Sequence, residues 1–255
     1  DNSLHSWGNQ VPDSEAFNSW SNNGGGVNIT VTANQIANPI NGQVTADLVA
    51  KTDVSFRAVY KYVFHNDAGT YAVSCYAKAN TNNTVTLLYG KADLSEYFRA
   101  VFNLSNGTSS LVVSVGASNV VASISAVGTD GWYRCSIIGT VTFTTTSVFY
   151  IYPDQYNLDN AGSVYLWGAQ VQQSTSLPTY ESYSNSTGTK TVTFTNAFKE
   201  LQGLTINPIN LATGDFYAIT NESATGFTIQ FKNSAGNGVG RKFDYVAKGF
   251  GRLET

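Results

Sequence analysis

The chain has 255 residues and a formal net charge of −3, and charged residues make up 12% of it. This length is enough for a large hydrophobic core, in two domains or in one large β domain with an appendage. A slightly acidic chain with few charges lacks the basic patch by which proteins bind nucleic acids, so we expect no nucleic-acid partner. Abundant Gly, Ser, Thr and Asn beside 15 Tyr and 14 Phe favour strands and turns and predict an all-β chain.

Short runs in which apolar and polar residues alternate follow one another from residue 28 onward. Asn-Gly at 106–107 and Asp-Gly at 130–131 are turn signals between such runs, because these residue types tolerate a positive φ. No helix is expected to cover the strands, so they must bury one face against a second sheet, which predicts a jelly-roll β-sandwich. Only 95–104 and 196–203 have patterns that also fit a helix. The expected strands are 27–34, 58–64, 70–79, 83–90, 97–104, 110–116, 120–128, 132–141, 147–153 and 163–171.

The segment from Leu111 to Gly128 contains no charged residue and is long enough to raise the question of a membrane span. Ser, Asn and Gly interrupt it at the spacing of strands rather than of a helix. We therefore expect two strands joined by a turn and no membrane insertion.

The motif DGWYRCSIIGT sets Arg134 beside Cys135, and an arginine activates a thiol only when the two groups are close in space. Strand alternation directs Arg134 to one face and Tyr133, Cys135 and Ile137 to the other. Cys75 has apolar neighbours at the same spacing. We therefore predict that both cysteines are buried, reduced and part of the core.

The polar stretch SYSNSTGTKT, near Tyr183, is typical of a linker between two domains. We predict a jelly-roll domain at 1–183 and a small β-sandwich tip domain at 187–255. About five strands are expected in the second domain, at 190–198, 203–211, 215–223, 226–233 and 241–249. A unit of roughly seventy residues buries little surface by itself, so we expect it to oligomerise. The absence of Met and of a basic, apolar leader favours a fragment or processed product whose upstream part is missing.

The residue types that catalysis needs are sparse. No Gly-x-Ser-x-Gly motif occurs, and the two histidines, His5 and His65, give a His-based triad poor support. Two cysteines far apart in the sequence do not make a zinc site. Acids suited to glycoside cleavage lie in or beside turns, where we expect solvated side chains and no catalytic pair. These acids are Asp93, Glu96, Asp154 and Asp159.

Two further segments contain groups that suit a ligand. Residues 152–163 include the Asp, Asn and carbonyl oxygens that calcium prefers, which leaves a structural calcium open, and we expect no other cofactor. The glycines at 236–242 suit a phosphate cradle, but such a loop must open a helix, and here a strand follows. We therefore expect a glycine-rich hairpin.

Several segments occur in a characteristic order, from SEAFNSW through NPINGQVTADLV, YAVSCYAKA, FNLSNGT and DGWYRCSI to SVYLWGAQVQQ. In this order they resemble the carbohydrate-binding-module-like jelly rolls of bacteriophage tail fibres and tailspikes. Three later segments, VTFTNAF, FYAITNESATGFTIQF and FDYVAKGFG, resemble the small trimeric β domains at fibre tips and, more distantly, the H-type lectin fold. The resemblance implies a homotrimer in the virion that acts outside the cell and recognises bacterial surface glycans, either capsule or lipopolysaccharide.

Shallow sugar sites need a flat aromatic face and planar amides or carboxylates. We predict that such groups are exposed in loops of both domains, and that three copies raise the avidity of weak sites. Two alternatives remain: a purely structural trimerisation and spacer module, and a polysaccharide depolymerase or esterase. The predicted glycan-binding residues are Trp20, Tyr89, Tyr152, Asp154 and Tyr156 in the first domain, and Asn221, Asn237, Arg241 and Tyr245 in the second.

Overall fold

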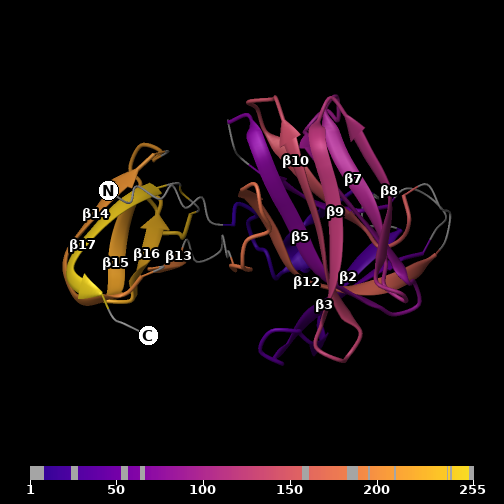
Figure 1. The fold of residues 1–255 in the computed structure, drawn as a ribbon, viewed down its shortest axis with the longest axis horizontal. Helices are drawn as coiled ribbons and strands as arrows, with labels where there is room; N and C mark the ends of the chain where they lie inside the picture. Colours follow the sequence, from indigo (N-terminus) through magenta and orange to yellow (C-terminus); the bar gives the residue numbers. More distant parts are fainter. Residues whose placement is uncertain are drawn as a thin grey trace. The chain divides into compact units, whose positions relative to one another are not determined.

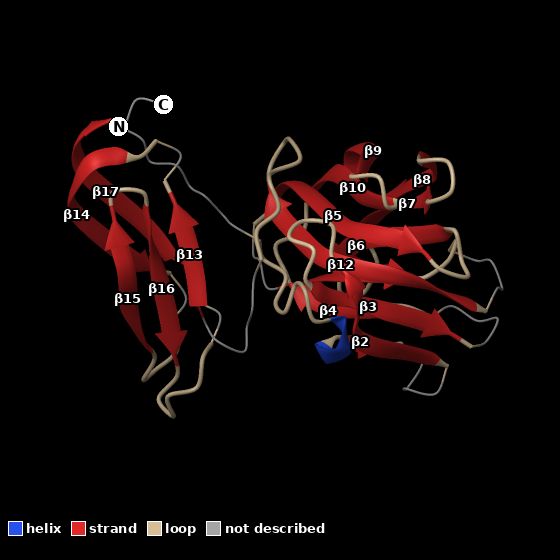
Figure 2. Cartoon of the chain, turned by 90° about the horizontal axis from the view of Figure 1, so that it is seen from below, coloured by secondary structure: helices blue, strands red, loops and turns tan. Residues whose placement is uncertain are grey.

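A computed structural model describes residues 9–23, 28–52, 57–63, 67–156, 161–182, 189–194, 196–209, 211–239, 241 and 243–252. Internal packing divides the chain into two compact units, with the division between Ser182 and Tyr183 (Figure 1). We call them the N-terminal unit and the C-terminal unit. Strands dominate both, and the helical element among the described residues is one 3-10 turn, η1, at Phe17–Ser19 (Figure 2). The chain is therefore all-β, as the composition predicts.

The N-terminal unit contains two six-stranded antiparallel sheets. Sheet A has the order β1-β4-β11-β6-β7-β8, with β1 at Ser21–Asn22, β4 at Val59–Val63, β11 at Ser147–Tyr152, β6 at Thr84–Lys91, β7 at Tyr97–Asn103 and β8 at Thr108–Val115. Sheet B has the order β2-β3-β12-β5-β10-β9, with β2 at Ile29–Ala37, β3 at Val44–Lys51, β12 at Gly162–Gln173, β5 at Gly69–Ala79, β10 at Trp132–Val141 and β9 at Ser118–Val127. Segments distant in sequence lie side by side, as where β12 separates β3 from β5 (Figure 1). This arrangement confirms the predicted jelly-roll β-sandwich.

The alternation pattern predicts every strand from β4 to β12, with ends that differ from the observed ones by at most two residues. It misses β3, because two of the positions of β3 that face the core are polar: Asp47 and Lys51 are both buried. Asp47 accepts hydrogen bonds from the backbone N–H of Phe17 (2.8 Å) and of Asn34 (3.0 Å). A strand with charged groups on its inner face lacks the apolar period from which strands are recognised. The helical alternative for 95–104 is wrong, because that segment forms β7.

The core of the N-terminal unit lies between the inner faces of sheets A and B. Tyr133, Cys135 and Ile137 of β10 contribute to it, as alternation predicts. Cys75 lies directly opposite Cys135 in the register of β5 and β10, and both are free thiols, fully buried. Burial raises the pKa of each thiol. The two cysteines are therefore packing residues, which confirms their predicted burial and reduced state.

The uncharged segment 111–128 forms most of β8 and β9 and the turn between them. Gly107 and Gly131, in the two turns marked by the Asn-Gly and Asp-Gly signals, have φ of +67° and +78°. A glycine adopts these angles without the steric penalty that a side chain would cause. Within the described ranges, no helix is long and apolar enough to cross a membrane.

The C-terminal unit is a small sandwich of two sheets. One has the order β13-β16-β15, with β13 at Thr189–Thr193, β16 at Gly226–Lys232 and β15 at Phe216–Ser223. The other pairs β14 at Phe198–Pro208 with β17 at Phe243–Arg252. Their inner faces meet in a core centred on Phe194, Phe227, Ile229 and Phe231. Residues 196–203 lead into and form part of β14, so the helical alternative there is also wrong.

Candidate functional site

The outer face of sheet A carries a group of tyrosines that strand alternation places together. Val59 and Val63 of β4 face the core, so Tyr60 and Tyr62 face outward. In the same way Phe149 and Ile151 of β11 are core residues, and Tyr150 and Tyr152 project from the opposite face. Tyr150 and Tyr152 therefore lie on the same outer face of sheet A as Tyr60 and Tyr62.

The strand register aligns these side chains across the sheet. Tyr60 of β4 lies opposite Tyr150 of β11, which lies opposite Leu88 of β6. Leu88 in turn lies opposite Arg99 of β7. Neighbouring strands are about 4.8 Å apart, so one line of side chains runs across four strands from an aromatic end to a cationic end.

The aromatic rings form a continuous series, which we call the tyrosine row: Tyr62, Tyr60, Tyr150, Tyr152 and Tyr156. Successive ring centroids are 5.6, 5.0, 6.0 and 5.2 Å apart. Tyr62 is 44% exposed and Tyr152 only 5%, while the other three are partly buried. Tyr152 therefore supports the row from beneath, and its neighbours present ring surface to the solvent.

Arg99 lies at one end of the tyrosine row. Its guanidinium carbon is 3.6 Å from the centroid of the Tyr156 ring, which is the geometry of a cation–π contact. Nε and Nη1 of Arg99 are buried and make no hydrogen bond with the part of the chain that the structure describes. The row therefore ends in a positive charge that lacks a counter-ion among those residues.

A buried ion pair fixes the turn that bears Tyr156. The ammonium of Lys51 and the carboxylate of Asp154 are in contact, with side chains 1% and 4% exposed. Thr86 Oγ1 donates to the carbonyl of Asp154 (2.8 Å) and accepts from the backbone N–H of Tyr156 (2.9 Å). Asn82 Nδ2 donates to the carbonyl of Pro153 (2.8 Å). The end of the row is thus held by groups from the strands β3 and β6 and the loop between β5 and β6.

The hydroxyl groups of Tyr150 and Tyr152 are neutral at physiological pH, because their pKa is raised. Burial raises the pKa of Tyr150, and the neighbouring Tyr62 and Tyr60 raise it further. Burial is also the main cause of the raised pKa of Tyr152. No described residue hydrogen-bonds to the hydroxyl of Tyr60, Tyr62 or Tyr150. A neutral phenol can both donate and accept, so these groups suit the hydroxyls of a polar ligand.

The outer face of sheet B carries a second aromatic group, which we call the tryptophan cluster: Tyr76, Trp132, Trp167 and Tyr180. The Trp167 and Tyr180 rings are 4.8 Å apart, and Tyr76 lies 5.4 Å from Trp167. Trp132 and Trp167 are only 4% and 3% exposed. Tyr76 and the two tryptophans are thus closed to solvent, and Tyr180, which is partly exposed, lies over Trp167.

The segment that follows β12 is the cover of the tryptophan cluster. Its Tyr180 hydroxyl lies 3.1 Å from Ser14 Oγ and donates to Glu15 Oε1 at 3.1 Å. Gln170 Nε2 donates to the carbonyl of Thr179 (3.1 Å), which ties the segment to sheet B. The covering chain is therefore held at several points.

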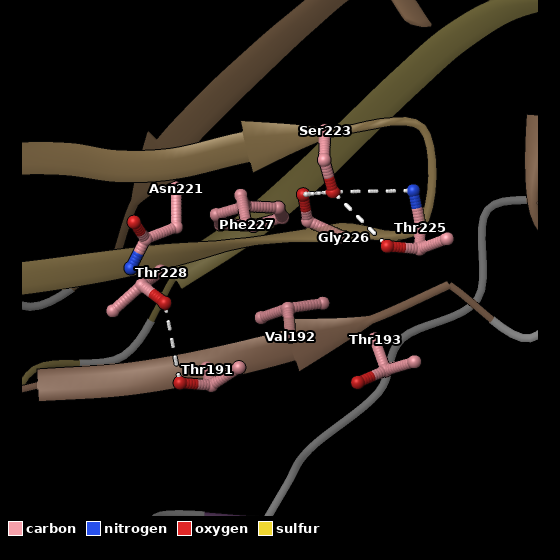
Figure 3. Close-up of a pocket in the computed structure, with 9 residues that line it drawn as sticks. All are labelled: Thr191, Val192, Thr193, Asn221, Ser223, Thr225, Gly226, Phe227 and Thr228. Atoms are coloured by element: carbon pink, nitrogen blue, oxygen red, sulfur yellow. Dashed lines mark hydrogen bonds between the residues drawn. The ribbon is translucent and has the colours of Figure 1, made fainter. Parts of the chain in front are cut away.

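The C-terminal unit has an open pocket of about 370 Å³ on the β13-β16-β15 sheet (Figure 3). Hydroxyl groups dominate its lining, and Figure 3 shows those of Thr191 and Thr228 joined across two strands, 3.2 Å apart. Asn221, whose φ is +52°, also lines it, at the irregularity where β15 turns toward β16. The only aromatic lining residue, Phe227, is 1% exposed and belongs to the core. The pocket offers hydrogen bonds and no open ring face.

Four of the five residues predicted as exposed sugar-binding groups in the N-terminal domain are buried, so their predicted exposure is wrong. Trp20 is 6% exposed and packs 4.7 Å from Phe17, because η1 turns it inward. Tyr89 is fully buried, since alternation in β6 directs it into the core. Tyr152 is covered by its tyrosine neighbours. The carboxylate of Asp154 is buried in an ion pair with Lys51. Only Tyr156 keeps partial exposure.

The predicted residues of the C-terminal domain are not brought together in one site. Asn221 lines the pocket, and the other three do not. Asn237 is exposed in the glycine-rich turn, where its backbone N–H donates to Asn233 Oδ1. Arg241 pairs with Asp215, and this contact lowers the pKa of that carboxyl. Tyr245 packs on Phe194 and Phe227, so it supports the core.

We expected the acids in the turns to be solvated, but two of them, Glu96 and Asp154, are buried. Glu96 is 9% exposed and accepts from the backbone N–H and the hydroxyl of Thr142 (2.6 and 2.8 Å). Asp93 is exposed, and a hydrogen bond from the Ser95 side chain lowers its pKa. Asp159 lies outside the described residues, as does much of the candidate calcium segment. Among the residues that are described, no three His, Cys, Asp or Glu side chains form a group that could hold a metal ion.

Sequence reasoning did not select Tyr60, Tyr62, Tyr150 or Arg99. The signal was present in the runs YKY, YIY and YFR, where alternation gives each strand one outward set of aromatic or basic side chains. The prediction of loop sites directed attention away from the sheet face. Only the register shows that these outward sets share one surface.

No protein-family model matches the sequence, and no curated protein matches it significantly. Among solved structures, the chain is similar to TmCBM61, a structure obtained in complex with beta-1,4-galactotriose. The match has a TM-score of 0.39 and 13% identity, and it covers 65% of this chain and 99% of that one. At this identity the similarity does not transfer the ligand of that module to this chain.

Proposed function

We propose that this chain is a non-catalytic glycan-binding protein and that the tyrosine row is its binding surface. The observation that carries the proposal is a series of ring contacts of 5.0–6.0 Å on an open sheet face. Aromatic rings stack on the apolar faces of sugar rings, and neutral phenol groups hydrogen-bond to sugar hydroxyls. The row is longer than one ring, so the ligand class is an oligosaccharide or polysaccharide.

We further propose the biological setting that the sequence resemblance implies. In this setting the chain is the receptor-binding part of a phage tail fibre or tailspike, acts as a homotrimer, and attaches the virion to capsule or lipopolysaccharide. The C-terminal unit supports association of copies, since large apolar side chains such as Val246 and Phe250 are 55% and 65% exposed in it. Three weak sites on one particle would bind a repetitive polysaccharide with high avidity.

The test is a glycan array probed with the purified chain, followed by titration calorimetry on the glycans that bind. Tyr150→Ala is expected to weaken binding by roughly tenfold or more, because it removes the central ring of the row. Tyr150→Phe keeps the ring and is expected to retain most of the affinity. Val121→Ala is a matched surface control, since Val121 is 63% exposed on β9 of the other sheet.

Light scattering on the same samples measures the number of copies in the particle. A clean trimer that binds no glycan on the array contradicts the glycan-binding proposal and favours a purely structural spacer. Shortened polysaccharide chains after incubation contradict the non-catalytic part of the proposal.

A further inference from the structure

We infer that the tyrosine row selects an acidic polysaccharide, and that Arg99 binds the carboxylate of one of its sugars. This inference rests on the proposed glycan-binding function and goes beyond it by naming the ligand class. Its basis is the unpaired charge at the end of the row, beside the ring of Tyr156.

Arg99 differs from the other arginines whose side chains the structure describes. Arg57 donates to the carbonyl of Asn23, and Arg241 pairs with a carboxylate. Arg134 donates from Nη2 to Ser74 Oγ (3.2 Å) and to Gln170 Oε1 (2.9 Å). Arg99 has no such acceptor among the described residues, although two of its nitrogen atoms are buried.

A buried donor without an acceptor is unfavourable, so its persistence points to a partner that the chain itself does not supply. The Tyr156 ring covers one face of the guanidinium, and Nε and Nη1 are buried, so Nη2 is the nitrogen at which an acceptor from outside the chain can approach. A carboxylate suits this nitrogen best, because charge-assisted hydrogen bonds to arginine are the strongest available. Hydroxyl groups of a neutral sugar would satisfy the donors but not the charge.

A single cation favours a singly charged group. Lys51, the other buried cation near this turn, is paired with Asp154 and is 1% exposed at its side chain. One guanidinium matches the charge of a uronic acid carboxylate more closely than that of a phosphate, which usually requires several donors. The register then places the acidic sugar at the β7 end of the row and its neighbours over Tyr150 and Tyr60.

Carboxyl reduction supplies a matched pair of ligands, because it replaces the carboxylate of a uronic acid by an alcohol and keeps the sugar's stereochemistry. The probes are polygalacturonate, alginate and hyaluronate, each beside its carboxyl-reduced form, with galactan and mannan as neutral polymers. Binding is measured by affinity electrophoresis with the intact chain. We expect at least one acidic polymer to bind tenfold or more tightly than its reduced form.

Variants assign the preference to the guanidinium. Arg99→Gln is expected to bind both forms equally, at the level of the reduced polymer, and Arg99→Lys to recover part of the preference. Arg134→Gln, on the other sheet, is expected to keep it in full. Thermal melting of each variant confirms that it is folded.

Four outcomes overturn the inference in different ways. Equal binding of acidic and reduced polymers by the unaltered chain, or a preference that Arg99→Gln retains, contradicts it and leaves the glycan-binding proposal intact. An Arg99-dependent preference for poly(glycerol phosphate) over all the uronic polymers assigns the site to phosphate instead. A folded chain that binds none of the acidic, reduced or neutral polymers contradicts the proposed function as well.

Discussion

The two outer faces of the N-terminal sandwich each carry an aromatic group, and the two groups differ in what lies over them. On sheet A the tyrosine row reaches the solvent, with Tyr62 44% exposed. On sheet B the tryptophan cluster is closed, with Trp167 3% exposed under Tyr180. Aromatic residues on the outside of a sheet are thus not in themselves a binding surface. The chain that crosses them decides whether they contribute to stability or to recognition.

The polar groups of the two faces differ in the same way. On sheet B, Arg134 donates to Ser74 and Gln170, and the covering segment is itself hydrogen-bonded. On sheet A, Arg99 and the phenols of Tyr60 and Tyr150 have no such partners among the described residues. Sheet B also has such groups, because Nε of Arg134 and Nε1 of Trp167 are buried without a partner in the described chain. The difference between the two faces is therefore the hydrogen-bonded covering segment on sheet B and the exposure of Tyr62 on sheet A.

The largest expected effect is a loss of stability when the tryptophan cluster on sheet B is disrupted. Trp167→Ala is expected to lower the free energy of unfolding of the N-terminal unit by about 3–5 kcal/mol, because it leaves a cavity beneath Tyr180. Trp167→Phe is the milder control, since Nε1 of Trp167 is buried without a hydrogen bond in the described chain and its loss removes none. Urea unfolding measures both. A loss below about 1 kcal/mol for the alanine variant would show that the cover is not packed on the cluster.

The next effect concerns the Lys51–Asp154 ion pair, which holds the end of the tyrosine row. Lys51→Met is expected to lower the free energy of unfolding by about 3–5 kcal/mol, because it leaves the Asp154 carboxylate buried and unpaired. Lys91→Met is the matched control: the Lys91–Asp93 pair is 2.9 Å long but solvent-exposed, so its loss is expected to lower stability far less than the loss of the buried pair.

Denaturant midpoints of the two lysine variants provide the comparison. Equal losses for the two would contradict the inference that burial makes the Lys51–Asp154 pair important. The double variant Lys51→Met/Asp154→Leu is expected to recover much of the loss, since it leaves no uncompensated charge.

A smaller effect is expected from a change in the tyrosine row on sheet A. Tyr62→Ala is expected to weaken glycan binding by about tenfold, and to lower stability by less than about 1 kcal/mol because the ring is exposed. Calorimetric titration and thermal melting separate the two quantities. A variant that loses stability while keeping its affinity would place Tyr62 with the tryptophan cluster as a structural residue.

A pH effect involves both aromatic groups. Burial is the main cause of the raised pKa of Tyr150 and Tyr152 in the row and of Tyr180 in the cover. An unfolded tyrosine ionises near pH 10, so above that pH the unfolded chain releases protons that the folded chain keeps. Stability from these groups is thus fully present below about pH 10 and falls as pH rises further. Tyrosinate absorbance should rise together with unfolding; a rise that precedes unfolding for all three would contradict this.

The smallest expected signal comes from the core between the two faces. Cys75 and Cys135 are fully buried and burial raises their pKa, so neither should react with a thiol reagent in the folded chain. Both should react after denaturation, in a reagent titration without reductant. Fast labelling of the folded chain would show that the sandwich opens.

Much of the fold follows from alternation, because one buried face per strand leaves a period of two in the sequence. This is why Cys135 and Ile137 were placed in the core from the sequence. β3 was missed because buried Asp47 and Lys51 replace apolar residues on its inner face. Tyr89 was predicted to be exposed, yet it shares the inward face of its strand with Leu87 and lies in the core.

The sequence by itself determined the all-β class and which side of each strand is apolar. Only the tertiary structure decided which outward side chains remain open. That decision depends on long-range packing: the segment with Tyr180 closes sheet B, and the Lys51–Asp154 pair holds Tyr156 beside Arg99 on sheet A. Neither contact leaves a local pattern, because the partners are far apart in the chain and meet only when both sheets have formed.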